Sequence, residues 1–308
     1  MRRRSFVVGL AAMGAGCGML GNASETETEP EQADEGDKKK KKKSKEPEEE
    51  GAKGPGQHWL EAEHDGKTRK SLLYIPESDS DAPKPLLFAL HGVKGDANTL
   101  FENKNFGDMC AKNGWIGLFP STGKDHVDRS NALDQEYLAS VLEQVIAEEN
   151  VDSKRVYVVG YSAGAKKAYH LAATHSEQIT AIVTHSGRIG HEGDEKLWSP
   201  TENGAGKVSV LHIHGKQDPK ATIGGGKDKN GKMAVGVMDG LKLWADNNGC
   251  EKGGSERPAG APDSVKVTNW VSGSGHKVVG LVDPDLGHSW ADYSNKVLAG
   301  FLNSVPPK

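Results

Sequence analysis

One stretch constrains the fold more than any other: residues 155–165 read RVYVVGYSAGA. A β-branched run ends at Gly160, Ser162 stands between two glycines, and small residues at helical spacing follow. This order predicts a strand, a sharp turn and a helix, with Gly-x-Ser-x-Gly at the turn. The turn needs small neighbours, and Ala163 and Gly164 meet that need. We expect the Ser162 hydroxyl to stand above a sheet as a nucleophile; the alternative is a Gly-Ser loop.

The rest of the folded part alternates short apolar strands with helical patterns. Strands are expected at 71–75, 85–92, 114–120, 179–184, 208–214, 265–271 and 277–282, and helices around 101–109 and at 133–149, 233–247 and 289–302. This alternation predicts the α/β class, with a doubly wound, mostly parallel sheet and helices on both faces. In such sheets the functional site lies beyond the carboxyl ends of the strands.

A serine becomes a strong nucleophile only when a base takes its proton, and that base needs an orienting acid. In one chain order of such triads, the acid and then the base follow the serine. Asp218 is the candidate acid because it sits just past the end of the strand at 208–214. A turn-capping aspartate is the plain alternative, and Asp283 and Asp285 are rivals for the role.

His288 is the candidate base, since it comes after both Ser162 and Asp218, follows the last strand and opens the last expected helix. A capping or surface histidine is the alternative. His276 is less attractive because it precedes a strand. His212 and His214 lie on the strand before the acid and are expected to be structural, with His214 as a candidate for lining the pocket.

Two backbone N–H groups are expected to form an oxyanion hole, which holds the negative oxygen of an acyl-transfer intermediate. One is the N–H of Ala163, directly after the nucleophile. The other is the N–H of Val93, in the turn His91-Gly92-Val93 that follows an earlier strand. An ordinary glycine turn is the alternative reading of that segment.

Substrate contacts are expected from residues beside these groups: His91, Tyr161 and Trp290. An exposed Trp198, Trp244 or Trp290 could stack on sugar or phenolic rings, although core packing is the commoner fate of tryptophan. The stretches 189–207 and 224–232 follow no recognisable pattern and are expected to shape the substrate site.

The N-terminal residues differ in composition from the rest. Residues 1–20 join a charged Arg2-Arg3-Arg4 start to a short apolar run that reaches Cys17, too short to span a bilayer. They resemble an export signal of a bacterial lipoprotein, in which Cys17 would carry the lipid; a twin-arginine signal and simple secretion remain alternatives. We therefore expect an exported protein, lipid-anchored to a bacterial membrane on its periplasmic or outer face.

Residues 21–56 are a low-complexity, highly charged segment with almost nothing apolar to bury, and are expected to be a disordered linker. Its lysine run at 38–43 could bind an anionic surface, or serve only as solvated spacer. The catalytic domain is then expected at 57–308. A net charge of -4 with no basic concentration in the folded part argues against a nucleic-acid partner.

Taken together, these motifs resemble the α/β-hydrolase family of polyhydroxybutyrate depolymerase-like and feruloyl/acetylxylan esterases. The resemblance covers about residues 66–290 and rests on the ordered segments 85–92 with Gly95, 114–120, 151–157, 160–164, 214–218 and 287–290. It implies an α/β-hydrolase fold, Ser162 as nucleophile, Asp218 as acid and His288 as base. It also implies secreted hydrolysis of carboxylic esters, often polymeric or cell-wall esters, without a cofactor.

Some residues depart from the family pattern. Val93 stands where family members often have cysteine. Lys166-Lys167 replace an apolar pair that is usual after the turn at the nucleophilic serine. Cys250 resembles a family cysteine that pairs with a later one, but no later cysteine follows; pairing with Cys110 is left open. The histidines lack ligand spacing, so no metal site is expected. Two other functions stay open: a serine peptidase of the same fold, and a surface-tethered binding protein without catalysis.

Overall fold

The computed structural model describes residues 52–64, 66–93, 95–121, 131–228, 230–253 and 256–308. The expected export signal with Cys17, and the linker up to residue 51, lie outside the described residues. Within the described residues, no helix combines the length and the apolar character needed to cross a membrane.

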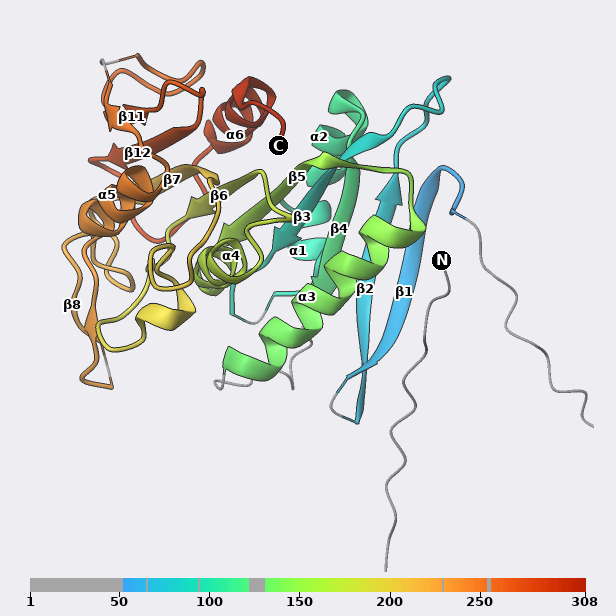
Figure 1. Ribbon diagram of the computed structural model, residues 1–308, viewed down its shortest axis with the longest axis horizontal. Coiled ribbons are helices and arrows are strands. Elements are labelled where there is room, and N and C mark those ends of the chain that lie inside the picture. Colours follow the sequence, from blue (N-terminus) through green and yellow to red (C-terminus); the bar gives the residue numbers. More distant parts are fainter. Residues whose placement is uncertain (1–51, 65, 94, 122–130, 229, 254–255) are drawn as a thin grey trace, which may run out of the picture. The chain divides into compact units, whose positions relative to one another are not determined.

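Ten of the described strands form one sheet, in the order β1-β2-β4-β3-β5-β6-β7-β12-β11-β10 (Figure 1). The strands are β1 (Gly56–His64), β2 (Lys67–Ile75), β3 (Lys84–Leu90), β4 (Ile116–Ser121), β5 (Val151–Tyr161), β6 (Ala181–His185), β7 (Ser209–Gly215), β10 (Glu251–Lys252), β11 (Lys266–Val271) and β12 (Lys277–Asp283). From β4 to β12 in this order, neighbouring strands run parallel, and the outer pairs are antiparallel. The expected mostly parallel α/β sheet is confirmed.

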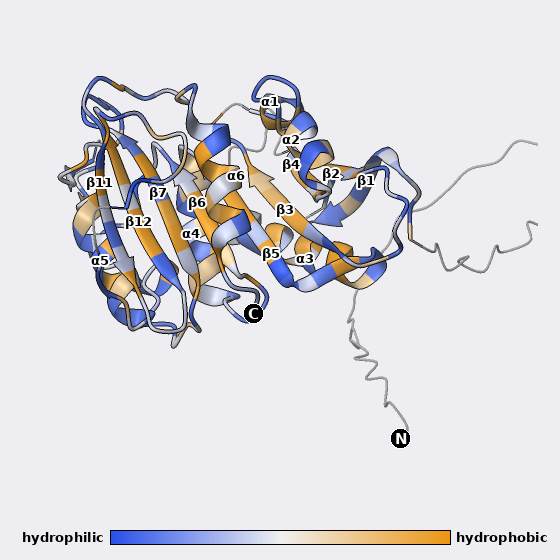
Figure 2. Ribbon diagram, turned by 90° about the horizontal axis from the view of Figure 1, so that it is seen from above, coloured by the Kyte–Doolittle hydropathy of each residue, from blue (hydrophilic) through white to orange (hydrophobic). Residues whose placement is uncertain are grey.

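Helices cover both faces of this sheet, as expected. They are α1 (Ala97–Phe101), α2 (Phe106–Asn113), α3 (Asn131–Glu148), α4 (Ala163–Thr174), α5 (Val237–Asn247) and α6 (Ser294–Ser304). Buried side chains of α3, α4 and α5 pack in one apolar cluster, and those of α1, α2 and α6 pack in another. Figure 2 shows the apolar central strands that these helices cover.

The two clusters lie on opposite faces because side chains alternate along a strand. In β3, Leu86 and Phe88 belong to the cluster with α3 to α5, whereas Leu87 and Ala89 belong to the one with α1, α2 and α6. β3 is therefore apolar on both faces, as expected for a strand in a buried layer. Strands β6 and β7 also bury polar side chains, among them Thr184 and His212.

Three elements differ from the sequence expectation. β1 was not expected as a strand; its side chains alternate between exposed and half-buried along its pairing with β2. The helix expected at 233–247 begins at Val237, because Met233–Ala234 form strand β9, paired with β8 (Gly226–Lys227). The helix expected at 289–302 begins at Ser294, and the Ala291 N–H donates to the ring of His185 instead.

The two described cysteines are buried free thiols, so the pairing between Cys110 and Cys250 that the sequence left open does not occur. Cys110 lies on α2 inside an apolar cluster. The Sγ of Cys250 lies 3.4 Å from the His276 carbonyl oxygen, to which it donates. Burial raises the pKa of both thiols.

Candidate active site

The expected turn between strand and helix joins β5 to α4 at Ser162. Ser162 has φ 55° and ψ -112°, in a region that side-chain-bearing residues rarely adopt. A Cβ on Gly160 would lie 2.3 Å from the Gly164 carbonyl oxygen, and one on Gly164 would lie 2.0 Å from the Leu90 carbonyl oxygen. The two glycines of Gly-x-Ser-x-Gly are thus required because backbone passes where a side chain would be. A strained turn of this kind holds Ser162 in one position.

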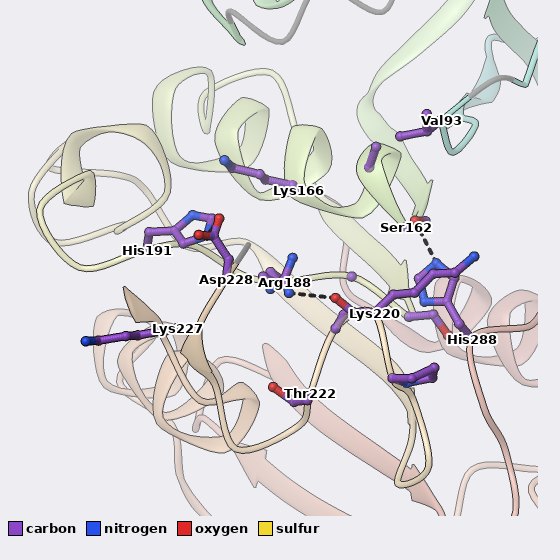
Figure 3. Close-up of a pocket in the computed structure, with 15 residues that line it drawn as sticks. Val93, Ser162, Lys166, Arg188, His191, Lys220, Thr222, Lys227, Asp228 and His288 are labelled. Carbon is purple, nitrogen blue, oxygen red and sulfur yellow. Dashed lines mark hydrogen bonds and ion pairs between the residues drawn. The ribbon is translucent and has the colours of Figure 1, made fainter. Parts of the chain in front are cut away.

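The structure brings the three expected triad residues together from three strand ends (Figure 3 shows Ser162 and His288). Ser162 Oγ lies 2.9 Å from His288 Nε2, and His288 Nδ1 lies 2.7 Å from Asp218 Oδ2. Ser162 follows β5, Asp218 follows β7 and His288 follows β12. His288 lies in the loop after β12 and does not open the last helix, which starts six residues later at Ser294.

The hydrogen bonds of Asp218 fix the protons in this chain. Its Oδ1 accepts the N–H groups of Lys220 and Ala221, at 2.8 and 2.9 Å, which leaves Oδ2 to accept from His288 Nδ1. Burial alone would raise the pKa of Asp218, but the Ala221 N–H and His288 lower it below its ordinary value. His288 Nδ1 therefore carries a proton, and its Nε2 is free to accept the proton of the Ser162 hydroxyl.

One rival acid, Asp283, and the rival base, His276, form hydrogen bonds elsewhere. Asp283 accepts the Tyr293 hydroxyl and the Asp285 N–H, both at 3.0 Å. His276 lies before β12, and its Nδ1 is 3.0 Å from the Ser274 hydroxyl. Neither of these contacts reaches Ser162, so the geometry favours Asp218 and His288 in the two roles.

Both expected oxyanion donors lie at the cavity beside Ser162. Ala163 is the first residue of α4, where backbone N–H groups have no partner inside the helix and the helix dipole favours negative charge. Val93 is 58% exposed and lines the same cavity. A Cβ on Gly92 would approach Ser162 Cβ to 3.2 Å, so a glycine there keeps the Val93 backbone close to the serine. Their role as donors stays a prediction.

The three expected substrate contacts support the loops around the triad. The ring of His91 is buried, with Nδ1 2.7 Å from the Gly92 carbonyl oxygen. Tyr161 donates its hydroxyl to the His288 carbonyl at 3.0 Å. Trp290 stacks on His185 with ring centroids 4.6 Å apart. These three described residues are not among those that line the cavity, and contact with substrate stays a prediction for them.

Histidines expected to be structural form a buried chain beneath the acid. His214 donates from Nε2 to the Ala221 carbonyl at 2.6 Å, so its Nδ1 accepts from His212 Nε2 at 2.9 Å. His212 Nδ1 then accepts a hydroxyl, from Thr184 at 2.8 Å or from Tyr169 at 2.9 Å. The chain ends at the turn that carries Asp218, and all of its members are buried. The sequence placed His214 as a possible pocket residue, but the structure buries it.

A cavity of 660 Å³ opens beside the triad (Figure 3). Its far side is formed by residues that we call the charged wall: Lys166, Arg188, His191, Lys227 and Asp228. Sequence reasoning gave none of them a role. Their only signals were the unusual Lys166 and the two patternless stretches, which indeed contribute His191, Lys227 and Asp228. In the described residues, no group of three or more His, Cys, Asp or Glu side chains could hold a metal ion.

Comparison with known proteins gives a family for these features. A family model described as "Esterase PHB depolymerase" matches residues 70–224, which run from β2 through Ser162 and Asp218. The bifunctional acetylxylan esterase/xylanase XynS20E of Neocallimastix patriciarum is 29% identical over 159 residues, 50% of this chain and 22% of that protein. A probable feruloyl esterase C of Aspergillus niger is 24% identical over 234 residues, 74% of this chain and 79% of that one.

Among solved structures, an acetyl xylan esterase from Aspergillus awamori superposes with a TM-score of 0.57 at 15% identity. The match covers 80% of this chain and 99% of that one. At this identity the likeness concerns the fold alone, and it confirms the fold class expected from the sequence.

Proposed function

Since this chain belongs to the Esterase PHB depolymerase family and is a carboxylic ester hydrolase, we propose that it is a serine esterase acting through Ser162, His288 and Asp218. The observation that carries the proposal is the unbroken line of hydrogen bonds from Ser162 Oγ through the His288 ring to Asp218 Oδ2, at 2.9 and 2.7 Å. Such a line is what an unactivated hydroxyl needs to attack a carbonyl at neutral pH.

The proposed reaction has two halves. Ser162 Oγ forms a bond to the ester carbonyl carbon as His288 Nε2 takes the hydroxyl proton, and the N–H groups of Ala163 and Val93 hold the oxyanion. The bond to the alcohol oxygen then breaks, and His288 returns the proton to the leaving alcohol. Water repeats the sequence on the acyl-enzyme, which releases the acid and restores Ser162. Asp218 stays ionised throughout and stabilises the charged His288 ring.

The finer substrate class is also a proposal. The relatives' names point to esters of plant cell-wall polymers, acetylated or feruloylated, and the family name points to polyhydroxybutyrate. A cavity that opens at the strand ends and is partly polar fits a polymer chain with an ester beside Ser162. Feruloyl, acetyl-sugar and hydroxybutyrate esters, assayed side by side, would rank these classes.

The decisive test compares the full chain with its Ser162→Ala variant on a short p-nitrophenyl ester. Removing a nucleophile that works as part of a triad should lower kcat by about 10⁶-fold. A fluorophosphonate should label the wild type on Ser162 and leave the variant unlabelled. Unchanged hydrolysis in Ser162→Ala would overturn the assignment, and the absence of both hydrolysis and labelling in a folded wild type would favour a binding protein.

Export and lipid anchoring at Cys17 belong to the same proposal. They rest on the pattern of residues 1–20, which lies outside the described residues. In a bacterial host fed a labelled fatty acid, the wild type should carry label and sediment with membranes, and Cys17→Ala should do neither. A Cys17→Ala protein that still sediments with label would contradict lipidation at that residue.

A further inference from the structure

The charged wall carries an excess of positive charge beside the nucleophile. Besides His288, the ionisable residues that line the cavity are four cations, one histidine and one carboxylate: Lys166, Arg188, Lys220, Lys227, His191 and Asp228. An uncharged ester forms no ion pair with these cations and therefore cannot offset the free energy of desolvating them. The positive charge of the cavity lining therefore favours a ligand with an anionic group.

Lys166 lies one helical turn after Ser162, in the first turn of α4. Residues four apart on a helix are neighbours about 5–6 Å apart, so the lysine stem starts next to the nucleophile. Its side chain is half-buried and makes no ion pair with any described carboxylate. The nearest acids are already bonded: Asp194 pairs with Lys232 at 2.9 Å, and Asp228 accepts two backbone N–H groups.

Arg188 follows β6 and reaches the same cavity from the other side of α4 (Figure 3). One guanidinium nitrogen, Nη2, donates to the Lys220 carbonyl at 2.6 Å. This bond anchors the group without neutralising it, and no described carboxylate forms an ion pair with it. A guanidinium that is held by one nitrogen keeps others to donate to a carboxylate or a phosphate.

The carboxylate of Asp228 attracts both cations at longer range but forms an ion pair with neither. Its Oδ1 accepts the N–H groups of Asn230 and Lys232, at 2.8 and 3.0 Å. Its Oδ2 lies 3.3 Å from His191 Nε2. The acid thus holds the hairpin through Oδ1, and its contacts leave Lys166 and Arg188 among the cations available to a ligand.

The arrangement of groups around Ser162 indicates which part of a bound ester would lie near these cations. At a tetrahedral carbon on Ser162 Oγ, the oxyanion must face Val93 and Ala163, and the leaving oxygen must face His288. In Figure 3 Val93 lies above Ser162 and His288 lies below it, whereas Lys166, Arg188 and His191 all lie to the left of Ser162. The remaining substituent, the acyl chain, is the one that points toward the charged wall.

We propose that Lys166 and Arg188 bind an anionic group, a carboxylate in the first instance, on the acyl portion of the ester. This rests on the proposed esterase function and adds to it a preference for acyl chains with a negative end, such as half-esters of dicarboxylic acids. The anion lies several bonds from the scissile carbonyl, because Lys166 directs its ammonium group away from Ser162 (Figure 3).

The test uses two matched p-nitrophenyl esters of adipic acid, one with the far end as free carboxylate and one with it as the neutral primary amide. The two have nearly the same shape and differ in charge. With the full wild-type chain, kcat/KM should favour the carboxylate by about tenfold or more, as expected for a charge-assisted pair. The preference should shrink at about 1 M salt, where charges are screened beyond about 3 Å.

Lys166→Met and Arg188→Met should each reduce the ratio of the two kcat/KM values, and the double variant should bring it near one. Lys166→Glu should reverse the preference, which loss of packing alone would not do. Lys112→Met removes the same charge from the remote helix α2 and should leave the ratio as in the wild type. A second matched pair, p-acetoxybenzoate and p-acetoxybenzamide, places the charge on the alcohol side and should show little preference.

The outcomes separate two failures. Equal kcat/KM for the adipate carboxylate and amide in the wild type would overturn the inference while leaving the esterase intact. A preference for the carboxylate that is seen only with the acetoxybenzoate pair would overturn the assignment of the anion to the acyl side. A preference that is unchanged in the double variant would show that Lys166 and Arg188 do not bind the anion. Hydrolysis of neither ester, with Ser162 unlabelled by a fluorophosphonate, would mean that the esterase proposal itself fails.

Discussion

The two sides of the cavity are built in different ways. One side, which we call the catalytic side, consists of Ser162, Asp218 and His288. These residues follow the ends of β5, β7 and β12, and short hydrogen bonds join their side chains. The charged wall comes mostly from two irregular stretches, one between β6 and β7 and one between β7 and α5, where the regular structure is the 3₁₀ turn Glu195–Leu197 and the two-residue strands β8 and β9. The sheet thus positions the proposed catalytic triad, whereas irregular segments outside the sheet form the part of the cavity that we propose selects the substrate.

After removal of Ser162 itself, the largest effect should come from the exchange of one atom of Asp218. In Asp218→Asn the oxygen must stay with the N–H groups of Lys220 and Ala221, so the new NH₂ faces His288 Nδ1. The histidine must then accept at Nδ1 and carry its proton on Nε2, where it can no longer take one from Ser162. We expect kcat to fall about 10⁴-fold with little loss of stability. A fall of tenfold or less, measured on a p-nitrophenyl ester, would contradict the role of Asp218.

The same substitution on each side gives the next comparison. In Gly164→Ala the new Cβ would lie 2.0 Å from the backbone carbonyl oxygen of Leu90, which cannot easily move aside. We therefore expect a loss of more than about 3 kcal/mol in unfolding free energy. In Gly224→Ala, near the charged wall, the new Cβ meets nothing within 4 Å, and the change should stay within about 0.5 kcal/mol. Urea unfolding of both variants checks this; similar losses would mean that the two sides are equally rigid.

Acid should weaken the fold through the histidines beneath the catalytic side. Burial lowers the pKa of His185 to about 3 and lowers the pKa of His212 well below its ordinary value. Both are neutral in the fold and take up protons in the unfolded chain, so stability is complete above about pH 6.5 and falls as the pH drops below it. Each contributes a slope of about 1.4 kcal/mol per pH unit.

Urea unfolding between pH 7.5 and pH 5 measures that slope. His212→Gln should have the smaller slope, whatever its stability at pH 7.5, because one of the titrating histidines is gone. Equal slopes in the variant and the wild type would show that His212 does not titrate on unfolding. If the unfolding free energy of the wild type does not change with pH in this range, neither histidine contributes to acid destabilisation.

Sequence reasoning predicted that Ser162, Asp218 and His288 meet, because the signals for their positions are local, and their catalytic roles stay a proposal. A β-branched run before small residues identifies β5 and the turn at Ser162, and Asp218 and His288 were found because they directly follow strands in the required chain order. The start of α6 was misplaced because the Ala291 N–H bonds to His185, which lies 106 positions away in the sequence. No local pattern carries that kind of information.

The charged wall was not predictable for the same reason. Arg188, His191 and Asp228 become neighbours only when the hairpin β8–β9 folds back toward the segment after β6, where His191 bridges to Ala234. The irregular chain has no periodicity to indicate which side chains face the cavity. Apart from the two patternless stretches, only Lys166 carried a signal, because the family usually has an apolar residue at that position.

The smallest effect should come from the ion pair behind the charged wall. Lys232 Nζ lies 2.9 Å from Asp194 Oδ2, but the two side chains are 56% and 23% exposed. Exposed pairs contribute little, so Lys232→Met should change the unfolding free energy by at most about 1 kcal/mol, and less in high salt. Because the variant frees Asp194 near Lys166, it should also weaken the preference for an anionic acyl chain. A large loss of stability with an unchanged preference would mean that this region is a structural support, and the contrast between the two sides would not hold.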